Sequence, residues 1–222
     1  LAGTARGIAD IARDGRNFDV TTLSIDAPAV SLTATGNLAD ESGTLTLAAR
    51  LANIAPYAPG FSGPATVEGT LGRITDGDWR SDLTGTGPGN IRVASAGTLA
   101  ENLSTANVTL DGAAPLSLAN RFISPRTVSG TLGFDLALNG PPGLQALSGR
   151  LETANARASS PNERIVLSDL DTTVTLSNGR AQLDVRARAE AGGQLTVHGP
   201  IALPAPFNGT LAIALNRLNV RD

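Results

Sequence analysis

A strict alternation of apolar and polar residues over Thr127–Asn139 places the tightest constraint on the fold. Val128, Leu132, Phe134, Leu136 and Leu138 share one phase, and polar or small residues fill the other. Successive side chains of a β-strand point to opposite faces, so a period of two indicates a strand with one apolar and one wet face. No helix would gather these residues on a single stripe. Most of the remaining chain is a variant of this strand.

The alternation recurs in segments of about ten residues that are joined mostly by tight turns. Asn178-Gly179 is the strongest hairpin signal. The apolar phase slips by one residue near Leu23 and again near Leu170, which predicts a β-bulge at each place. The sequence therefore predicts an all-β fold, an antiparallel meander of about a dozen strands.

Two segments interrupt this rhythm, and each contains two prolines. Leu51–Gly63 has apolar residues at wider spacing, which favours a short helix followed by a loop. Ala113–Pro125 could place Leu118 and Phe122 on one face of a second short helix. The first 16 residues suit either a short helix or a strand. The fold class thus includes one or two short helices.

The interrupted segments belong to an internal repeat. Val67–Gly72 and Val128–Gly133 share the pattern Val-x-Gly-Thr-Leu-Gly, and each follows a Leu-Ala-Asn tripeptide, at Leu51–Asn53 and Leu118–Asn120. Repetition is typical of structures built by adding similar units. We expect a single elongated unit over 1–222, with two sub-repeats at roughly 17–112 and 113–222. The absence of methionine suggests a piece or processed form of a longer protein.

Composition argues against several classes of function. The net charge is −3 and the 17 basic residues, all arginines, are scattered, so no nucleic-acid footprint is present. Without cysteine there are no disulfides or thiolate metal sites. No apolar stretch approaches 18 residues, so no helix is expected to span a membrane. We expect no cofactor, no metal and no enzymatic activity.

The few candidate catalytic or metal-binding residues support this expectation. His198 is the only histidine, and it lies in the polar phase without the usual nucleophilic or zinc partners. Asp76, Asp78 and Asp82 have a spacing loosely like that of a calcium loop, but the oxygen ligands that should follow are missing. A hairpin turn is the better interpretation of these aspartates.

So large an apolar face must be covered, because soluble proteins seldom expose apolar patches beyond a few hundred Å². A second sheet would give a sandwich or a closed barrel. A lipid-facing barrel needs aromatic girdles, which one Trp and one Tyr cannot supply. The third option is a sheet curled into an open trough filled by acyl chains. Periodicity alone does not distinguish the sandwich from the trough.

Four stretches resemble the TamB family of Gram-negative bacteria, which belongs to the AsmA-like superfamily: Pro115–Pro125, Val128–Gly140, Leu147–Leu151 and Leu170–Leu203. The resemblance implies a β-taco, an open U-shaped trough with a hydrophobic concave face. It also implies translocation and assembly module functions in outer membrane biogenesis. The protein would be periplasmic and anchored to the inner membrane through a segment not present here.

The resemblance implies lipid transport, in which the groove of a periplasm-spanning bridge carries phospholipid between the inner and outer membranes. The alternative is a scaffold or chaperone that assembles outer-membrane proteins with the barrel TamA by strand addition. A passive β-domain with a self-filled core is a third possibility. The expected partners are phospholipid acyl chains and, through other parts of the protein, TamA. The expected lipid-binding residues are the inward strand positions Val108, Leu110, Val128, Leu132, Phe134, Leu136, Leu138, Val174, Leu176, Leu183, Val185, Leu195, Val197, Leu211, Ile213 and Leu215.

Overall fold

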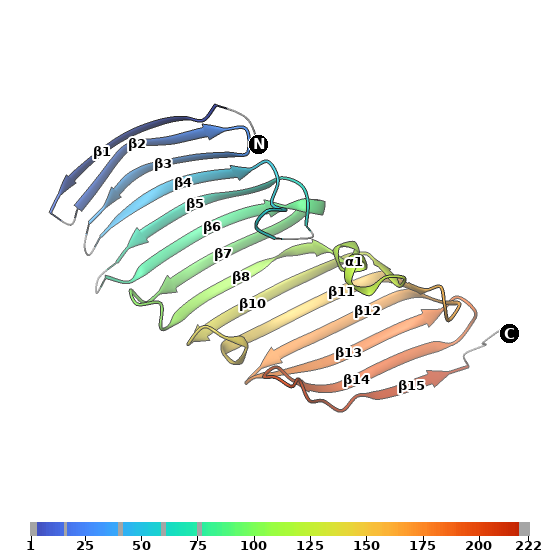
Figure 1. The fold of residues 1–222 in the computed structure, drawn as a ribbon. Helices are drawn as coiled ribbons and strands as arrows, with labels where there is room; N and C mark the ends of the chain where they lie inside the picture. Colours follow the sequence, from blue (N-terminus) through green and yellow to red (C-terminus); the bar gives the residue numbers. More distant parts are fainter. Residues whose placement is uncertain (1–3, 16, 40–41, 59–60, 75–76, 218–222) are drawn as a thin grey trace. The chain divides into compact units, whose positions relative to one another are not determined.

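The structure, a computed structural model, describes residues 4–15, 17–39, 42–58, 61–74 and 77–217. They form an all-β fold in which 15 strands follow one another in an antiparallel meander that does not close (Figure 1). The strand order is the sequence order, except that β9 pairs with β11 beside the main path. By internal contacts the chain divides into two units, residues 1–110 with 140–142, and residues 111–139 with 143–222.

Unit 1 is a simple meander of successive neighbours. Its strands are β1 (Arg6–Asp14), β2 (Asn17–Ala27), β3 (Val30–Leu38), β4 (Gly43–Leu51), β5 (Ala65–Arg73), β6 (Trp79–Gly87) and β7 (Ile91–Leu99), followed by the first half of β8 (Ala106–Pro115). A 3₁₀ turn, η2 (Pro88–Asn90), joins β6 to β7. The ambiguous N-terminal segment is therefore a strand.

Unit 2 contains the α-helix of the described chain. After β8 come η3 (Leu116–Ala119), α1 (Asn120–Ile123), β9 (Thr127–Ser129), β10 (Thr131–Gly140), η4 (Leu144–Ala146), β11 (Leu147–Ser160), β12 (Ile165–Ser177), β13 (Arg180–Ala189), β14 (Gln194–Ala202) and β15 (Ala212–Asn216). The apolar positions of the sequence also include Leu218 and Val220, which were expected to close the last strand and lie outside the described residues.

Each unit has an apolar face and a polar face, because directly paired residues of antiparallel strands lie on the same side of the sheet. In unit 1 the apolar face runs through Leu47 of β4 and Leu83 of β6, which flank Gly69 of β5. In unit 2 it runs through Phe134, Leu151, Val174 and Leu183, which are paired in turn across β10–β13. We use the names apolar face and polar face for these two sides below.

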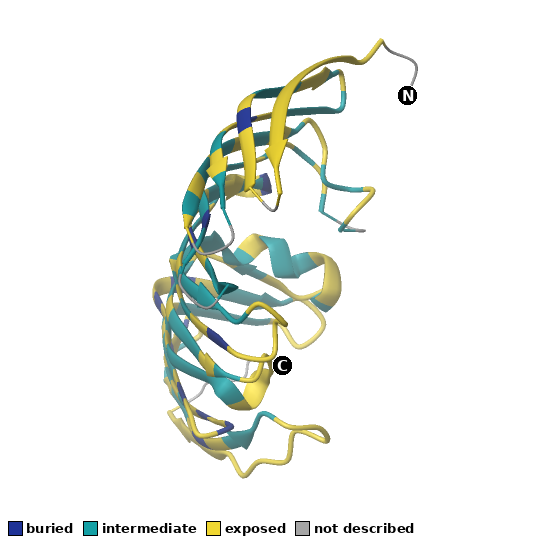
Figure 2. Ribbon diagram, turned by 90° about the vertical axis from the view of Figure 1, so that its left-hand side faces the viewer, coloured by how far each residue is buried: buried dark blue, intermediate teal, exposed yellow. Residues whose placement is uncertain are grey.

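The chain has almost no buried core. Among the residues that the structure describes, the buried hydrophobic ones are Val20, Leu176 and six alanines. Figure 2 shows the strands coloured almost entirely as intermediate or exposed. The chain exposes 13859 Å², whereas two compact domains sharing its 22.5 kDa mass would together expose about 11,400 Å². The sheet is therefore a single layer with both faces accessible over most of its area.

Both expected bulges are confirmed. The pairing register shifts between Val20 and Leu23 in β2, and between Ser168 and Asp171 in β12. The hairpin at Asn178-Gly179 is confirmed as well, because both residues have positive φ angles of 49° and 70°, as a two-residue type I′ turn requires. In each case a few adjacent residues in the sequence were enough to predict the feature.

Two expectations about continuity were wrong. The strand predicted over Thr127–Asn139 is divided at Gly130 into β9 and β10, which pair with different parts of β11. Leu51–Gly63 has no helix in its described residues and consists of turns. Its prolines limit helix formation, and the Asn53 side chain closes the segment into a loop, accepting hydrogen bonds from the backbone N–H groups of Ala55 and Gly63 at 3.1 Å each.

Glycine is required inside some strands of the apolar face. Gly149 of β11 has a φ of +122°, and a Cβ atom there would lie 2.2 Å from the carbonyl oxygen of Asp135 on β10. Gly69 of β5 is constrained in the same way, because its φ is +143° and a Cβ atom there would lie 2.0 Å from the carbonyl oxygen of Asp82. Such glycine kinks let neighbouring strands approach and bend the sheet.

Replacing Gly149 with alanine should therefore destabilise the protein by about 3 kcal/mol, because the added Cβ meets backbone and the φ angle becomes strained. Gly133→Ala is the matched control, since the nearest atom to a Cβ at Gly133 is 3.9 Å away. Urea unfolding followed by circular dichroism measures both variants. Equal stability of the two variants would contradict this account of the strand geometry.

Candidate functional site

The residues of unit 2 that were expected to bind lipid lie on one face of its sheet. In unit 2, Val185 of β13 pairs with Val197 of β14, which pairs with Ile213 of β15. Leu195 likewise pairs with Leu215. Register places Val128, Leu132, Phe134, Leu136, Leu138, Val174, Leu176 and Leu183 on the same face, and Leu211 follows beside Gly199. Register alone does not assign a ligand to them.

Val108 and Leu110 lie in β8, in the part that belongs to unit 1. The Cα of Val108 is 2.6 Å from the position that a Cβ of Gly97 would take, so the two residues are directly opposite on β8 and β7. Gly97 in turn pairs with Ser81 on β6. These two nominated residues therefore extend the apolar face of unit 1.

The apolar face is more accessible at one edge of unit 2 than in its middle. Leu176 of β12 is 6% exposed, whereas Ile213 and Leu215 of β15 are 64% and 57% exposed. Between them, Leu183 and Val185 of β13 are half-buried. Covering such half-exposed aliphatic side chains with an apolar partner is favourable, by about 25 cal/mol per Å² of apolar surface removed from water.

The polar face of unit 2 carries ion pairs. Arg188 contacts Asp169 at 3.4 Å, and Arg186 contacts Asp184 at 3.5 Å. His198 lies opposite Asp184 in the β13–β14 ladder. No group of three or more His, Asp or Glu residues that could hold a metal ion occurs within the described ranges.

Two of the three aspartates considered as a calcium loop lie in the described residues. The Asp78 carboxylate accepts a hydrogen bond from the backbone N–H of Glu101 at 3.2 Å. Asp82 lies within β6, opposite Thr70. Asp76 lies outside the described residues. In that part of the chain which the structure describes, no helix is long and apolar enough to cross a membrane.

The segment η3–α1 covers part of the apolar face of unit 2. The Leu116 backbone N–H donates to the Gly130 carbonyl at 2.9 Å, which draws η3 against the start of β10. A Cβ at Gly130 would lie 2.9 Å from the Ala156 Cβ and 3.6 Å from Leu116. Ala156 is accordingly only 1% exposed. Gly130 thus gives the covering segment room to approach the sheet.

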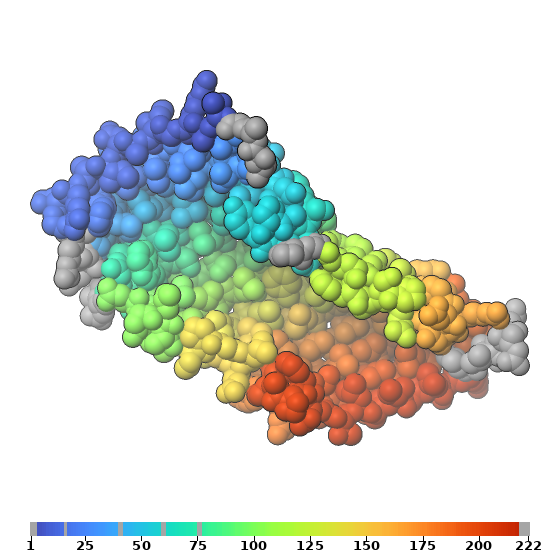
Figure 3. All heavy atoms as spheres, viewed as in Figure 1, coloured from blue at the N-terminus to red at the C-terminus, as the bar shows by residue number. Residues whose placement is uncertain are grey.

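An asparagine closes each of the two interrupted segments. Asn120 Oδ1 accepts a hydrogen bond from the Val128 N–H at 2.6 Å, so the start of α1 is tied to β9. Asn53 Oδ1 ties the start of its own segment to Gly63. These are the asparagines of the two Leu-Ala-Asn tripeptides. Figure 3 shows both segments standing out from the surface of the sheet.

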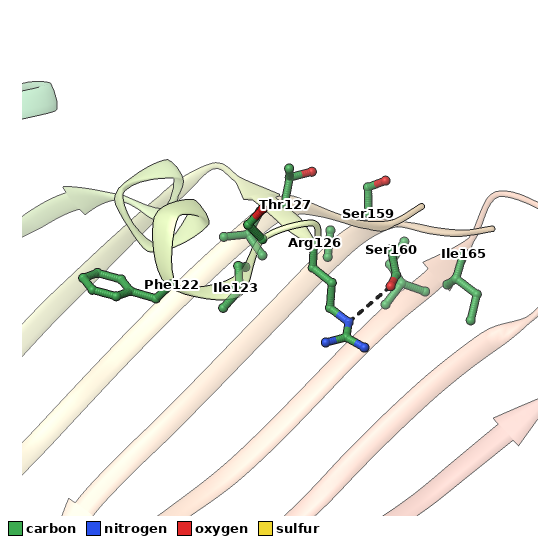
Figure 4. Close-up of a pocket in the computed structure, with 11 residues that line it drawn as sticks. Phe122, Ile123, Arg126, Thr127, Ser159, Ser160 and Ile165 are labelled. Atoms are coloured by element: carbon green, nitrogen blue, oxygen red, sulfur yellow. Dashed lines mark hydrogen bonds between the residues drawn. The ribbon is translucent and has the colours of Figure 1, made fainter. Parts of the chain in front are cut away.

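A pocket of about 450 Å³ opens beside α1. Phe122 and Ile123 line it from the helix, and Ser160 and Ile165 from the facing ends of β11 and β12, with Arg126 between them (Figure 4). Its volume lies within the range of small-molecule and side-chain pockets. This pocket and the apolar face around it form the candidate functional site.

A polar cluster forms one wall of this pocket. Arg126 Nε donates to Ser160 Oγ at 3.2 Å, and Arg126 Nη2 contacts Glu163 Oε1 at 3.1 Å. The Ser160 hydroxyl also donates to Glu163. This hydrogen bond, together with Arg126, lowers the pKa of Glu163 below its ordinary value. Glu163 therefore stays ionised and neutralises the arginine.

Of the residues that form the pocket, only Val128 was nominated from the sequence. Arg126 and Ser160, which line the pocket, come from two segments that no local pattern connects. The prolines before Arg126 and at 161 were the only signals that the chain turns there.

Asn120→Ala should expose the Val128 amide to solvent more often, because the hydrogen bond that closes the segment is lost. At about 1.4 kcal/mol for such a bond, hydrogen exchange at Val128 should accelerate about tenfold. Asn139→Ala is the control, because Asn139 is an exposed residue of β10. Unchanged exchange at Val128 would contradict the proposed closure.

The lowered pKa of Glu163 predicts a pH dependence of the cluster. Its contribution should be complete above the ordinary glutamate pKa of about 4.3 and be lost as pH falls through the lowered value. Carbon-detected NMR titration of the Glu163 carboxyl measures this pKa, and Ser160→Ala should raise it. A wild-type pKa at or above the ordinary value would show that the hydrogen bond is absent in solution.

The comparisons with known proteins give one family. Residues 73–217, nearly two-thirds of the chain, match the sequence model of the family described as type II secretion system (T2SS), protein N. No curated protein matches the chain. No solved structure matches it either.

This match corrects the resemblance to the TamB family, which was wrong. The functions implied by that resemblance, a lipid-transporting bridge and an assembly scaffold for TamA, were wrong with it. The stretches used for it consist mainly of alternating strands and turns, which any one-sided meander of this composition requires, so they do not distinguish families. The chain belongs to the type II secretion system protein N family.

Proposed function

We propose that this protein is a non-enzymatic component of a type II secretion system, and that its apolar face binds another protein of the system. The observation that carries the proposal is the alignment of half-exposed aliphatic side chains across β10–β15, with α1 covering only one part of them. A surface of this kind is typical of an interaction site.

The family supports a protein partner, because its printed description names one protein of a multi-component secretion system. A non-enzymatic role is supported by the roles of the polar residues, since Asp78, Asp169 and Asp184 are engaged in hydrogen bonds or ion pairs. We do not expect the protein to bind nucleic acid. Several arginines are paired with carboxylates, which leaves little concentrated positive charge.

The proposal includes a location and a shape. A periplasmic location is consistent with the family, and attachment to the inner membrane through another part of a longer protein is our inference. We further infer that, within each unit, the apolar face lies on the concave side of the curled sheet. The bulges in β2 and β12 and the glycine kinks support curvature of the strands that contain them.

A photo-crosslinking residue at Leu183 or Val185 tests the proposal in cells that carry the secretion system, with the full-length protein. Asp184 is the matched control, because it lies between the two residues in sequence and on the polar face. We expect adducts with a secretion-system protein at Leu183 and Val185 and none at Asp184, identified by mass spectrometry.

Two outcomes would contradict the proposal. Adducts of equal yield at Asp184 would mean that the apolar face is not the interaction surface. Adducts with phospholipid alone at Leu183 and Val185 would instead favour acyl chains as the occupant, an expectation from the sequence that stays a prediction.

A further inference from the structure

The first and last strands of the described sheet differ in how well they are protected against pairing with another chain. β1 carries four charged residues among its nine, which are Arg6, Asp10, Arg13 and Asp14. Its pairing register with β2 also shifts after Asp10. Charges and bulges are features by which natural proteins protect an open sheet edge. In contrast, residues 209–216 around β15 contain no charged residue, and β15 pairs with β14 in continuous register.

β15 has the composition of an interior strand. Ile213 and Leu215 lie on the apolar face of unit 2, and Ala212 and Ala214 lie on its polar face. Strands that are buried on both faces have such continuous apolar sequences, whereas β15 is exposed throughout. Among the strands that the structure describes, β15 pairs only with β14 (Figure 1). Its sequence therefore suits a strand that has a neighbour on each side.

The open side of β15 presents backbone groups, and these select a peptide strand as the occupant. The Thr210 N–H donates to the Pro200 carbonyl of β14 at 3.2 Å. Because the backbone groups of an antiparallel strand alternate in direction, those of Leu211, Ile213 and Leu215 point away from β14. Another strand can satisfy these N–H and C=O groups. The hydrocarbon part of a lipid cannot, because it has no hydrogen-bond donor or acceptor.

Residues 210–216 are self-complementary about Ile213. Their sequence, Thr-Leu-Ala-Ile-Ala-Leu-Asn, is almost the same in both directions. When two such strands pair antiparallel with Ile213 opposite itself, Leu211 lies opposite Leu215 and the two alanines lie opposite each other. The residues that point outward then form hydrogen-bonded pairs, and the small alanines occupy the closer non-hydrogen-bonded pairs. This match favours a second copy of the chain over an unrelated strand.

We propose that two copies of this chain dimerise by antiparallel pairing of residues 210–216, with Ile213 on the two-fold axis. The contact is isologous, because each copy contributes the same strand. The axis runs perpendicular to the sheet, so the apolar face of unit 2 continues into that of the second copy. The contact is small, and we expect a Kd of about 100 µM. The inference goes beyond the proposed function and does not depend on it.

Cysteine substitution tests the register, because the chain contains no cysteine of its own. Ile213→Cys places two thiols directly opposite each other, with Cα atoms about 5.5 Å apart, which a disulfide can bridge. Leu211→Cys is the matched control on the same face, because its two copies would lie four residues out of register, about 14 Å apart. Both side chains are exposed, so neither substitution removes a buried contact.

We expect the disulfide-linked dimer of the full-length protein to form about tenfold faster with Ile213→Cys than with Leu211→Cys, because only the first pair is within bridging distance. Non-reducing electrophoresis after mild oxidation measures both rates. Equal rates would mean that the chains meet by random collision or through another surface, and either result would overturn the inference.

Charge at the same position tests the dimer without a covalent bond. Ile213→Lys and Ile213→Glu each place two like charges directly opposite, which should raise the Kd about tenfold. An equimolar mixture of the two variants places opposite charges together and should dimerise again. Sedimentation velocity of the full-length protein at about 200 µM measures the association. Ile8→Lys, at an exposed position of β1, is the control and should leave wild-type association unchanged.

A monomeric wild-type protein at this concentration would overturn the inference, and so would a mixture of the two charged variants that does not associate. The crosslinking experiment at Leu183 and Val185 is a separate test, because both residues lie in β13, two strands from the open side of β15. Loss of the dimer with successful crosslinking would keep the proposed function. A confirmed dimer without secretion-system adducts would keep the dimer and remove the proposed function.

Discussion

The structure depends on the backbone hydrogen bonds between successive antiparallel strands. In most domains these bonds are supported by a buried core, but the described residues of this chain bury little beyond small alanine side chains. Each strand is therefore held mainly by its two neighbours in the sheet. Stability in such an arrangement is close to a sum of local terms, as in repeat proteins. Local features such as Gly149 and Asn120 consequently matter more than they would in a globular domain.

The same constraint creates the surface that we propose as functional. A single layer cannot hide both faces, so the side chains that alternate toward the apolar face stay half-exposed unless something covers them. In unit 2, η3 and α1 cover only the region around Ala156. The pocket forms where this cover ends. Fold and candidate site thus have one physical origin, which is the absence of a second layer.

Much of the fold could be predicted from local patterns. The period of two gave the strands and their faces, and the phase slips near Leu23 and Leu170 gave the bulges, because both effects depend on adjacent residues. Gly130 was not recognised as a break, because its apolar neighbours keep the same phase on both sides. The prediction of a helix in Leu51–Gly63 was wrong, because the spacing of apolar residues does not reveal that the Asn53 side chain closes this segment by hydrogen bonds.

The candidate site was predictable only in part. Register within unit 2 groups the nominated residues as the alternation required, but the pocket joins Arg126 to Ser160 and Glu163 across more than 30 positions. Such contacts depend on how η3 and α1 fold back onto the sheet, and the alternation of apolar and polar residues carries no information about that. The family could not be obtained from the same patterns either. Every family with a one-sided sheet needs strands that alternate between apolar and polar residues, so this pattern does not identify the family.

The central claim is that the apolar face of unit 2 is open to its surroundings. Relaxation of methyl signals by a soluble paramagnetic probe measures this directly in the isolated protein. The account predicts strong relaxation at Ile213 and Leu215, intermediate relaxation at Leu183 and Val185, and weak relaxation at Leu176. Uniformly weak relaxation at all five residues would mean that a second layer covers the face, and would contradict the account.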